Sequence, residues 1–470
     1  MEIAVKPIQM AVCALMTLTL AACATPEPAP ETEEVVEQAL PETTEIAVEY
    51  TELSTWGETI QQGAAKDGWL KSFGDPALEK IVAEALANNR NLAAAKANLD
   101  AAAASARQAG ASLAPAVAIG GGAESVTRDG STSNVSGAGL NMSWEVDVWG
   151  KLAAGAQAAE ESYQASAAEL EGARQSLVGQ TAKAWFQATE TNLQLQLADN
   201  AVAIFEEKLG IVQAMADAGA GSPQDVNLAK ADLSGAKERQ RAAQGAQKQA
   251  VRSIEVLLGR YPSAEIETAS EFVPTPPGIP VGVPADLLER RPDLQAAERR
   301  VAEAFQRVDE AKAARLPSFA LTASGGSPSS ELADLLGSGN FFSLGANFVA
   351  PLDVGGELEA QVEIETAQQE AALADYGALA LQAFNEVETG LTNEQLLLER
   401  EALLADEVKN NEEAAQLANV QFEAGAIDFL SVLQLQSRAL NSQVGLVSIK
   451  NTRLAQRVDL DLALGGDFEE

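Results

Sequence analysis

One pattern of residues occurs twice along this chain, so any fold must accommodate two copies of the same unit. Early landmarks such as Pro115 and Pro317 are 202 residues apart. Later glycines keep an offset of 206, in the pairs Gly150 and Gly356, Gly219 and Gly425, and Gly259 and Gly465. The four extra residues therefore fall between the proline and the first glycine of each copy, as expected of a loop tip. The repeat predicts two equivalent halves and not the roughly three domains that length alone suggests.

Each copy contains the same order of elements. An alanine-rich helix, about 76–113 or 285–315, ends near a proline and leads into a β-hairpin. The second strand of the hairpin, 138–148 or 342–352, alternates apolar residues with small or polar ones. Period two predicts a strand with one apolar face, which fits a position between lipid and water. The same alternation equally fits one sheet of a soluble sandwich.

Beyond Gly150 and Gly356 the apolar period becomes helical. Residues 151–218 and 357–423 contain no proline and are rich in alanine, glutamine, glutamate and leucine. At ~1.5 Å per residue each helix is about 100 Å long and needs partner helices along its length. A turn and a return helix follow in each copy, at 219–223 with 224–258 and at 424–427 with 428–464.

Composition removes several classes of function. The chain has no histidine, and its two cysteines, Cys13 and Cys23, both lie near the start. We therefore expect no zinc or thiol site, no metal and no cofactor. A formal net charge of −36 repels nucleic acid. The chain is predicted not to be an enzyme; a surface hydrolase working with carboxylates alone is an alternative, and it would need paired acids in one cleft.

The first residues predict export and anchoring. The apolar stretch Ile8–Ala22 has 15 residues, about 22 Å as a helix and short of the ~30 Å core of a bilayer. It therefore indicates a signal peptide. Leu20-Ala21-Ala22-Cys23 resembles the bacterial lipobox, which implies lipidation of Cys23, and Ala24 in place of aspartate implies sorting to the outer membrane.

The expected segments cover the whole chain. They are a lipoprotein signal peptide (1–22), a lipidated N-terminus with an acidic, proline-rich tether (23–68), repeat 1 (69–260), a proline-rich connector (261–284), repeat 2 (285–466) and a C-terminal tail (467–470).

Two hairpins supply four strands per chain, too few to close a barrel. An open sheet cannot expose its edge groups to lipid, and small closed barrels begin at about eight strands. If the strands lie in a membrane, several chains must share one barrel, and three chains would supply twelve strands. Such a ring leaves a central opening, so the function that follows is a conduit.

Several motifs together resemble the TolC-like outer membrane efflux protein family, in its OprM/NodT-type lipoprotein branch. The resemblance covers nearly the whole chain after the signal peptide. In order, the motifs are Phe73-Gly74-Asp75-Pro76, Trp144-Glu145-Val146-Asp147-Val148-Trp149-Gly150, Leu288-Glu289-Arg290-Arg291-Pro292-Asp293, Pro351-Leu352-Asp353-Val354-Gly355-Gly356, Ala383-Phe384-Asn385-Glu386-Val387-Glu388 and Ala463-Leu464-Gly465-Gly466.

The resemblance implies an α+β membrane protein. Long helical hairpins would form an α-barrel across the periplasm, and four strands per chain would join a shared trimeric twelve-stranded β-barrel. The homotrimer would be a lipid-anchored, passive conduit in the cell outer membrane for small molecules or drugs. Its partners would be a periplasmic adaptor (membrane fusion) protein and an inner-membrane pump, which in this family is usually of the resistance-nodulation-division type.

The resemblance also implies roles for the helical turns. Gly219, Gly221, Ser222 and Gly425 would meet the adaptor at the periplasmic tip, and a plain helical turn is compatible with that role. Leu430 matches an apolar ring that closes the tip. Gln434 stands where the family carries an aspartate ring, so a closed state less sensitive to cations is expected. Asp428 and Asp225 each lie just after one of the two turns and would supply acidic contacts to this gate.

Aromatic residues near the strand ends would lie at the membrane interfaces. They are Trp144, Trp149, Phe341 and Phe342. For Trp149, packing at the junction of strand and helix is an equally good interpretation, and Val354 stands where relatives often carry an aromatic residue. The main alternative for the whole chain is a lipid-anchored periplasmic coiled-coil adaptor. Two full copies, each with its own strands, argue against it.

Overall fold

The computed structural model describes residues 60–62, 68–129, 131–276, 279–281, 290–329 and 341–468. The predicted signal peptide, Cys23 and nearly all of the tether lie outside the described residues, as do Leu288 and Glu289. Copy one contains α3 (Trp69–Ser72), α4 (Pro76–Asn88), α5 (Arg90–Ala111), β2 (Ala116–Arg128), β3 (Ser131–Val146), α6 (Lys151–Asp217) and α7 (Pro223–Leu257). Copy two contains α9 (Pro292–Ala314), β5 (Ser318–Ser329), β6 (Phe341–Val349), α10 (Glu357–Glu423) and α11 (Phe429–Ala463).

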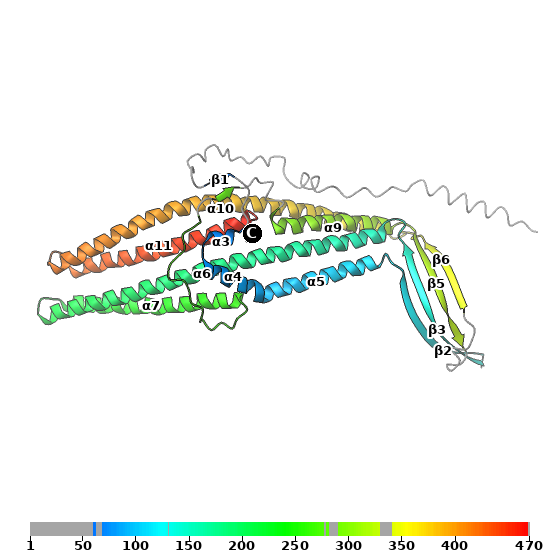
Figure 1. The fold of residues 1–470 in the computed structure, drawn as a ribbon, viewed down its shortest axis with the longest axis horizontal. Coiled ribbons are helices and arrows are strands. Elements are labelled where there is room, and N and C mark those ends of the chain that lie inside the picture. Colours follow the sequence, from blue (N-terminus) through cyan, green and yellow to red (C-terminus); the bar gives the residue numbers. More distant parts are fainter. Residues whose placement is uncertain are drawn as a thin grey trace, which may run out of the picture. The chain divides into compact units, whose positions relative to one another are not determined.

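The chain divides into two compact units. One includes Arg107–Ala159 and Val301–Leu373 and holds the four-stranded sheet. The other includes Glu160–Arg300 and Ala374–Glu470 and holds most of the length of the helical hairpins. Figure 1 shows α6 with α7 and α10 with α11 as two hairpins. Two further strands, β1 (Ile60–Gln62) and β4 (Ile279–Val281), pair in parallel and were not expected from the sequence.

The long helices confirm the predicted repeat. Helices α6 and α10 each have 67 residues, and α7 and α11 each have 35. Each helix ends at a glycine with positive φ, a conformation that costs glycine little: Gly219 (75°), Gly259 (69°), Gly425 (74°) and Gly465 (67°). The amide of the next residue then donates to the carbonyl five residues earlier, as in Ala220 to Met215 at 2.9 Å and Ala426 to Gln421 at 2.8 Å.

The single first helix predicted for copy one is wrong, because the chain breaks at Asn89. Its ψ of 129° is extended. Its side-chain oxygen accepts from the amides of Asn91 and Leu92 at 2.9 and 3.0 Å, and its amide nitrogen donates to the carbonyl of Leu257 at 2.9 Å. Asn89 therefore ends α4 and caps α5, and it ties both to the end of α7.

The sheet has the order β2-β3-β5-β6, and all its neighbours are antiparallel. Each hairpin is thus formed within one repeat, and the pairing of β3 with β5 joins the two repeats of the chain (Figure 1). The second strands differ from their predicted bounds: β3 begins at Ser131 and ends at Val146, and β6 ends at Val349. Pro351 lies beyond β6, as expected of a residue that has no amide hydrogen to donate.

The core of the helical unit lies where α3 and α4 meet the long helices. Trp69, Phe73 and Phe186 pack against one another, with ring centroids 6.2 Å apart for the first pair and 5.3 Å for the second. Residues from α6, α7 and α11 complete the cluster, among them Trp185, Ile254 and Val458. Alanine and valine dominate elsewhere, which suits close packing of long helices more than a thick globular core.

Candidate functional site

The sheet places its apolar side chains on one face. The strand register sets Val117 opposite Met142, and Leu140 opposite Ile119. The apolar face continues from the first repeat into the second, because Met142 of β3 lies opposite Ala323 of β5 and Ala323 lies opposite Leu344 of β6. The largest side chains of this face are strongly exposed: Ile119 (84%), Leu344 (74%), Phe342 (72%), Val117 (67%), Phe348 (61%) and Leu140 (54%). A soluble sheet would bury such a face, so it needs an apolar surrounding.

The opposite face is mostly polar or small, with Phe341 and Val349 as apolar exceptions at the two ends of β6. Ser324 and Ser343 lie across from each other, and their hydroxyl oxygens are 2.7 Å apart. Asn141, Ser143 and Asn347 occupy the same side by alternation. Strands β2 and β6 are the edges of this sheet, and in the described part of the chain neither has a second neighbour. Apolar on one side, polar on the other and open at both edges, the sheet is suited to a wall between lipid and water.

The junction from strand to long helix uses the same device in both copies. Asp147 accepts hydrogen bonds from the amides of Leu152 and Ala153 at 3.1 and 2.8 Å. Asp353 accepts one from the amide of Glu359 at 3.0 Å. Each carboxylate therefore satisfies free amides at the start of α6 or α10 and complements the helix dipole. The sequence analysis recognised the two motifs that contain Asp147 and Asp353, but it did not predict that these residues cap helices. An aspartate just before the start of a helix is the signal that would have indicated this capping role.

The two helical turns hold the residues predicted to dock an adaptor. Gly219 and Gly425 have positive φ, and no atom lies within 4 Å of where a Cβ would stand at either. At Gly221 a Cβ would lie 2.8 Å from the backbone nitrogen of Ala216, so the turn itself requires that glycine. Ser222 caps α7 through a 3.1 Å bond from the amide of Gln224. These geometries explain the turns; docking stays a prediction.

The predicted gate residues lie just after these turns. Asp428 caps α11 through a 2.7 Å hydrogen bond from the amide of Ser431, and hydrogen bonds from Ser431 lower the pKa of the Asp428 carboxyl. Asp225 lies in the first turn of α7. Leu430 is 48% exposed, and Gln434, one helical turn later on the same face, is also exposed.

The opposite face of α11 is buried against copy one. Phe429 and Leu433 join a cluster with residues of α6 and α7, including Phe205 and Val226. Phe429 also contacts Phe422 at the end of α10, with a centroid distance of 5.6 Å. The structure therefore brings the two turn regions together and leaves Leu430 and Gln434 facing outward from this packed group.

The predicted interface aromatics have different surroundings. The indole nitrogen of Trp144 donates to the carbonyl of Leu113 at 3.0 Å, and that of Trp149 donates to the carbonyl of Pro317 at 2.7 Å. Both tryptophans are half-buried where the first helices meet the sheet. Phe341 (49% exposed) and Phe342 (72%) are open on the sheet. Alternation places Trp144 with Met142 and Phe342 with Leu344 on the apolar face, whereas Phe341 shares the polar face with Ser343. A position at the membrane interface stays a prediction for all four aromatic residues.

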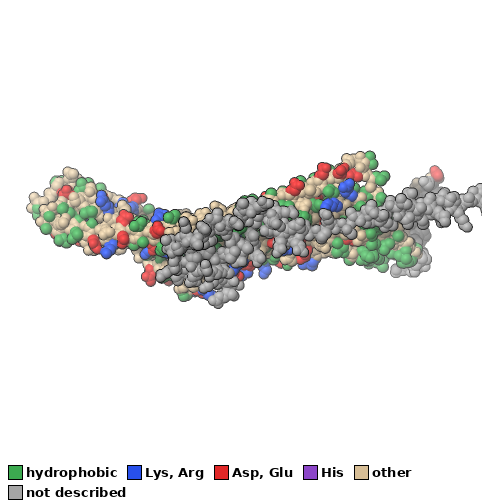
Figure 2. Space-filling model, turned by 90° about the horizontal axis from the view of Figure 1, so that it is seen from above, with side chains coloured by type: hydrophobic (Ala, Val, Ile, Leu, Met, Phe, Trp, Pro, Cys, Tyr) green, Lys and Arg blue, Asp and Glu red, His purple; other side chains and the backbone are tan. Residues whose placement is uncertain are grey.

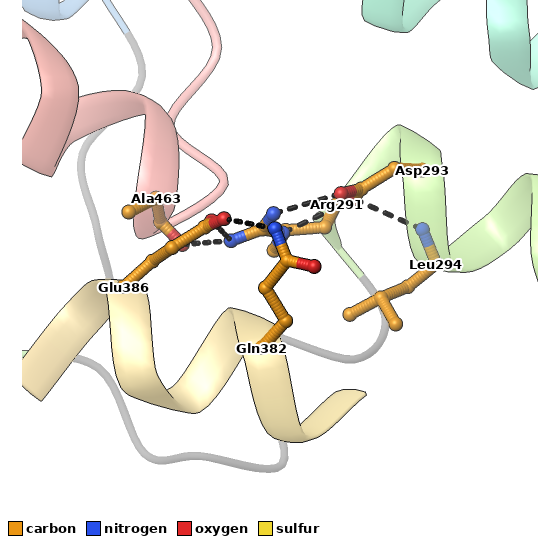
Figure 3. A network of polar contacts seen from close by, with 6 residues as sticks. All are labelled: Arg291, Asp293, Leu294, Gln382, Glu386 and Ala463. Carbon is orange, nitrogen blue, oxygen red and sulfur yellow. Dashed lines mark hydrogen bonds and ion pairs between the residues drawn. The ribbon is translucent and has the colours of Figure 1, made fainter. Parts of the chain in front are cut away.

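Three motifs of copy two meet at Arg291, which is 8% exposed (Figure 3). Its guanidinium donates to Asp293 at 2.7 and 3.1 Å, to Glu386 at 2.8 Å and to the carbonyl of Ala463 at 3.4 Å. Burial disfavours the charged guanidinium, but the two carboxylates outweigh it and raise the pKa of Arg291 above its usual value. The network ties α9, α10 and α11 together and therefore has a structural role.

Buried charges on α10 and α11 were missed in the sequence. Arg453 donates to Glu394 at 3.2 Å and to Glu401 at 2.9 Å. Burial raises the pKa of Glu394 although Arg453 opposes it, and burial raises the pKa of Asp461 to about 6 although Arg457 lies 3.4 Å away. Charged residues at helical spacing are usually solvated, so only the packing identifies these as interior.

Comparison with known proteins adds to this geometry. The model of the family described as "Outer membrane efflux protein" matches residues 81–260 and 283–466. The chain belongs to this family. Within this family, the chain is 30% identical over 426 residues to the probable efflux pump outer membrane protein TtgC of Pseudomonas putida. This match covers 88% of the chain and 88% of TtgC. It is 31% identical over 417 residues to the pyoverdine export outer membrane protein OpmQ of the same species, covering 85% of this chain and 88% of OpmQ.

Solved structures agree with this membership of the outer membrane efflux protein family. The chain superposes on the outer-membrane channel OprN with a TM-score of 0.82 and 25% identity, covering 89% of this chain and 96% of OprN. The Campylobacter jejuni CmeC outer membrane channel shows the same fold, with a TM-score of 0.82 at 24% identity. This match covers 87% of the chain and 90% of CmeC.

These matches confirm the predicted family and the fold class of long helical hairpins with four strands in two repeats. They support the outer membrane efflux channel and not the periplasmic adaptor. In the described part of the chain, no helix combines the length and the apolar character needed to cross a membrane.

Proposed function

We propose that three copies of this chain form the outer membrane channel of a tripartite efflux system. The twelve strands would close one barrel, and the helical hairpins would form a cylinder through the periplasm. The chain would act as a passive conduit for small molecules, with no catalytic step of its own. A periplasmic adaptor and an inner-membrane pump, of the resistance-nodulation-division type by resemblance, would supply substrate and energy.

The observation that carries this proposal is the four-stranded sheet. Its one apolar face is exposed over all four strands, and its edge strands β2 and β6 have unpaired outer sides in the described chain. Backbone groups at such edges are too costly to leave unpaired in lipid, so the edges must pair with strands of other copies. Joining β6 of one copy to β2 of the next satisfies every edge and closes the wall.

Extraction and electrophoresis test the proposal. The protein should sediment with outer membranes, need detergent for extraction, and migrate as a trimer before heating and as a monomer after it. A stable monomer recovered in buffer without detergent would contradict the proposal. Acyl groups on Cys23 would anchor each copy and are detectable by mass spectrometry of the N-terminal peptide.

Leu430 and Gln434 would form the closed constriction at the periplasmic tip, near Asp428 and Asp225. Three glutamines facing one axis can hydrogen-bond without binding cations, whereas three aspartates would repel one another and attract them. We therefore expect millimolar divalent cations to change the single-channel conductance of the natural protein little. Gln434→Asp should make the channel strongly blocked by the same cations.

Gln436→Asp is the matched control for the gate. It adds the same charge on the same helix, about 200° around its axis from Gln434. Equal cation block in both variants, or strong block of the natural protein, would show that Gln434 does not line the constriction.

The turns themselves would contact the adaptor. The open space around Gly219 and Gly425 supports this assignment, because a partner backbone could approach there. Ser222 and Gly221 lie in the same turn as Gly219 and would share that surface. Crosslinking from residues of the turns to a co-expressed adaptor tests the assignment.

A further inference from the structure

A cavity of about 840 Å³ lies between α6, α9, α10 and α11. Every residue that lines it belongs to the helical unit, so a single chain forms its walls. Its volume is within the range of roughly 300–1,000 Å³ that is typical of sites for small organic molecules. Aliphatic side chains supply part of the wall, among them Ala168, Ala296, Leu379 and Leu462. The cavity therefore offers an apolar surface of a suitable size for such a molecule.

The charges on the wall of the cavity do not balance. Four acidic and two basic side chains line it. Glu169 forms an ion pair with Arg300, and Asp459 lies 2.6 Å from the Nζ of Lys183 on α6. The remaining charges are those of the Arg291 network, in which one guanidinium serves two carboxylates. The described charges thus leave one negative charge in excess at this wall.

Copy one ties the same helix ends together without any charge. There Asn89 stands in the place of Arg291, and its amide nitrogen donates to the carbonyl of Leu257 at 2.9 Å. The counterparts of the two carboxylates are the uncharged Asn91 and Gln180. Taking charges out of water is costly, even when they are paired. The charges of copy two therefore exceed what the tie requires, which leaves them available for binding.

Two side chains of the cavity have hydrogen-bonding capacity to spare. One oxygen of Glu386 accepts from Arg291 at 2.8 Å and the other from Gln382 at 3.0 Å (Figure 3). The Glu386 side chain is still 37% exposed, and each carboxylate oxygen can accept a further bond. Gln175 is only 8% exposed, and in the described part of the chain its side-chain amide has no hydrogen-bond partner. Buried amides normally have one, so Gln175 is free to bond to a ligand.

We propose that this cavity binds a small amphipathic organic cation, that is, an apolar ring system with a charged nitrogen. The charged group lies against Glu386, a polar group of the ring system bonds to Gln175, and the rings contact Leu379 and Leu462. The apolar wall favours an organic cation over an inorganic one. The inference goes beyond the proposed function, which assigns the chain neither a binding site nor a preference among small molecules.

Dye binding to the full protein in lipid nanodiscs tests the inference. Proflavine, a planar tricyclic cation with two amino groups, is titrated against the protein and followed by fluorescence anisotropy. Anthracene carboxylate, an anion with a ring system of the same size, is the comparison dye. We expect saturable binding of one proflavine per chain and at least about tenfold weaker binding of the anion.

Three variants locate the bound dye in the cavity. Glu386→Gln keeps an oxygen that accepts from Arg291 but removes the charge, so it should weaken proflavine binding at least about tenfold. Gln175→Leu removes only the free amide and should weaken it about threefold to tenfold. Thr389→Trp fills the cavity from an exposed position of its wall, leaves the Arg291 network intact, and should abolish binding.

A matched control separates binding in the cavity from general attraction of cations. Figure 2 shows acidic side chains spread along the helices, so any cation is attracted to some extent. Glu388→Gln removes the same charge from the same helix, about 200° around its axis from Glu386 and outside the cavity wall. It should leave proflavine binding unchanged.

The outcomes distinguish this inference from the proposed function. No saturable proflavine binding, equal binding of the two dyes, or equal weakening by Glu386→Gln and Glu388→Gln would overturn the inference and leave the channel intact. A protein that binds proflavine in the cavity but stays a monomer in buffer without detergent would support the inference and contradict only the proposed function.

Discussion

Leu344→Arg should abolish assembly of the channel in the outer membrane. Leu344 lies on the apolar face of β6, 74% exposed, directly opposite Ala323 of β5. An arginine on the lipid face near the middle of a membrane strand costs about 2–4 kcal/mol. Three copies in one barrel raise the cost to about 6–12 kcal/mol, which is comparable to the whole stability of many proteins. We expect the heat-modifiable trimer in outer membranes to fall at least about tenfold, measured by seminative electrophoresis.

Ser343→Arg is the matched control for this prediction. Ser343 is the preceding residue on the same strand, so its depth is nearly the same, but its side chain points to the polar face and contacts Ser324. Arginine there should leave the trimer largely assembled and change ion selectivity, because that face would line the lumen. If both variants assembled equally well, the apolar face would not be in contact with lipid.

Asp75→Ala should strongly destabilise the helical unit. One carboxylate oxygen caps α4 by accepting from the amides of Ala77 and Leu78 at 2.9 and 3.1 Å. The other accepts from the indole nitrogen of Trp185 at 2.8 Å. Loss of an N-cap costs about 1 kcal/mol, and a buried donor left without a partner costs about 1–3 kcal/mol. We therefore expect a loss of about 2–4 kcal/mol per chain, seen as a lower melting temperature in detergent.

A double-mutant cycle separates the two contributions of Asp75. In a Trp185→Phe background there is no indole donor to satisfy, so Asp75→Ala should cost only the cap, about 1 kcal/mol. Glu79→Ala removes a half-buried acid in the first turn of the same helix and should cost less than about 1 kcal/mol. An equal loss from Asp75→Ala in both backgrounds would show that the bond to Trp185 contributes nothing.

The regular elements could be predicted because their signals are local. The alternation after Gly137 requires a strand, and proline-free stretches between glycines require long helices; the structure confirms both to within a few residues at most ends. The glycines at the helix ends were visible for the same reason, since positive φ selects that residue type. Asn89 was missed because a helix break inside an alanine-rich segment depends on a contact with Leu257, far away in sequence.

The candidate site was predictable only in part. Leu430 and Gln434 could be placed on one helical face by spacing, and the structure leaves that face exposed. The internal position of Glu190 could not be seen in the sequence. A glutamate in a helix is normally solvated, and here it is buried because Ser448, Asn451 and Gln194 all hydrogen-bond to it.

The sequence alone determined the repeat, the element order and the family, because period, proline, glycine and motif spacing are properties of the chain itself. It also predicted four strands per chain, too few to close a barrel without other chains. Only the tertiary structure decided which strands pair between the two repeats of the chain, namely β3 and β5. It also decided that one apolar face runs from β2 to β6 and how α11 lies on α6. These are matters of register between segments far apart in sequence. Register is decided by side chains that meet in space, and a linear pattern leaves it open.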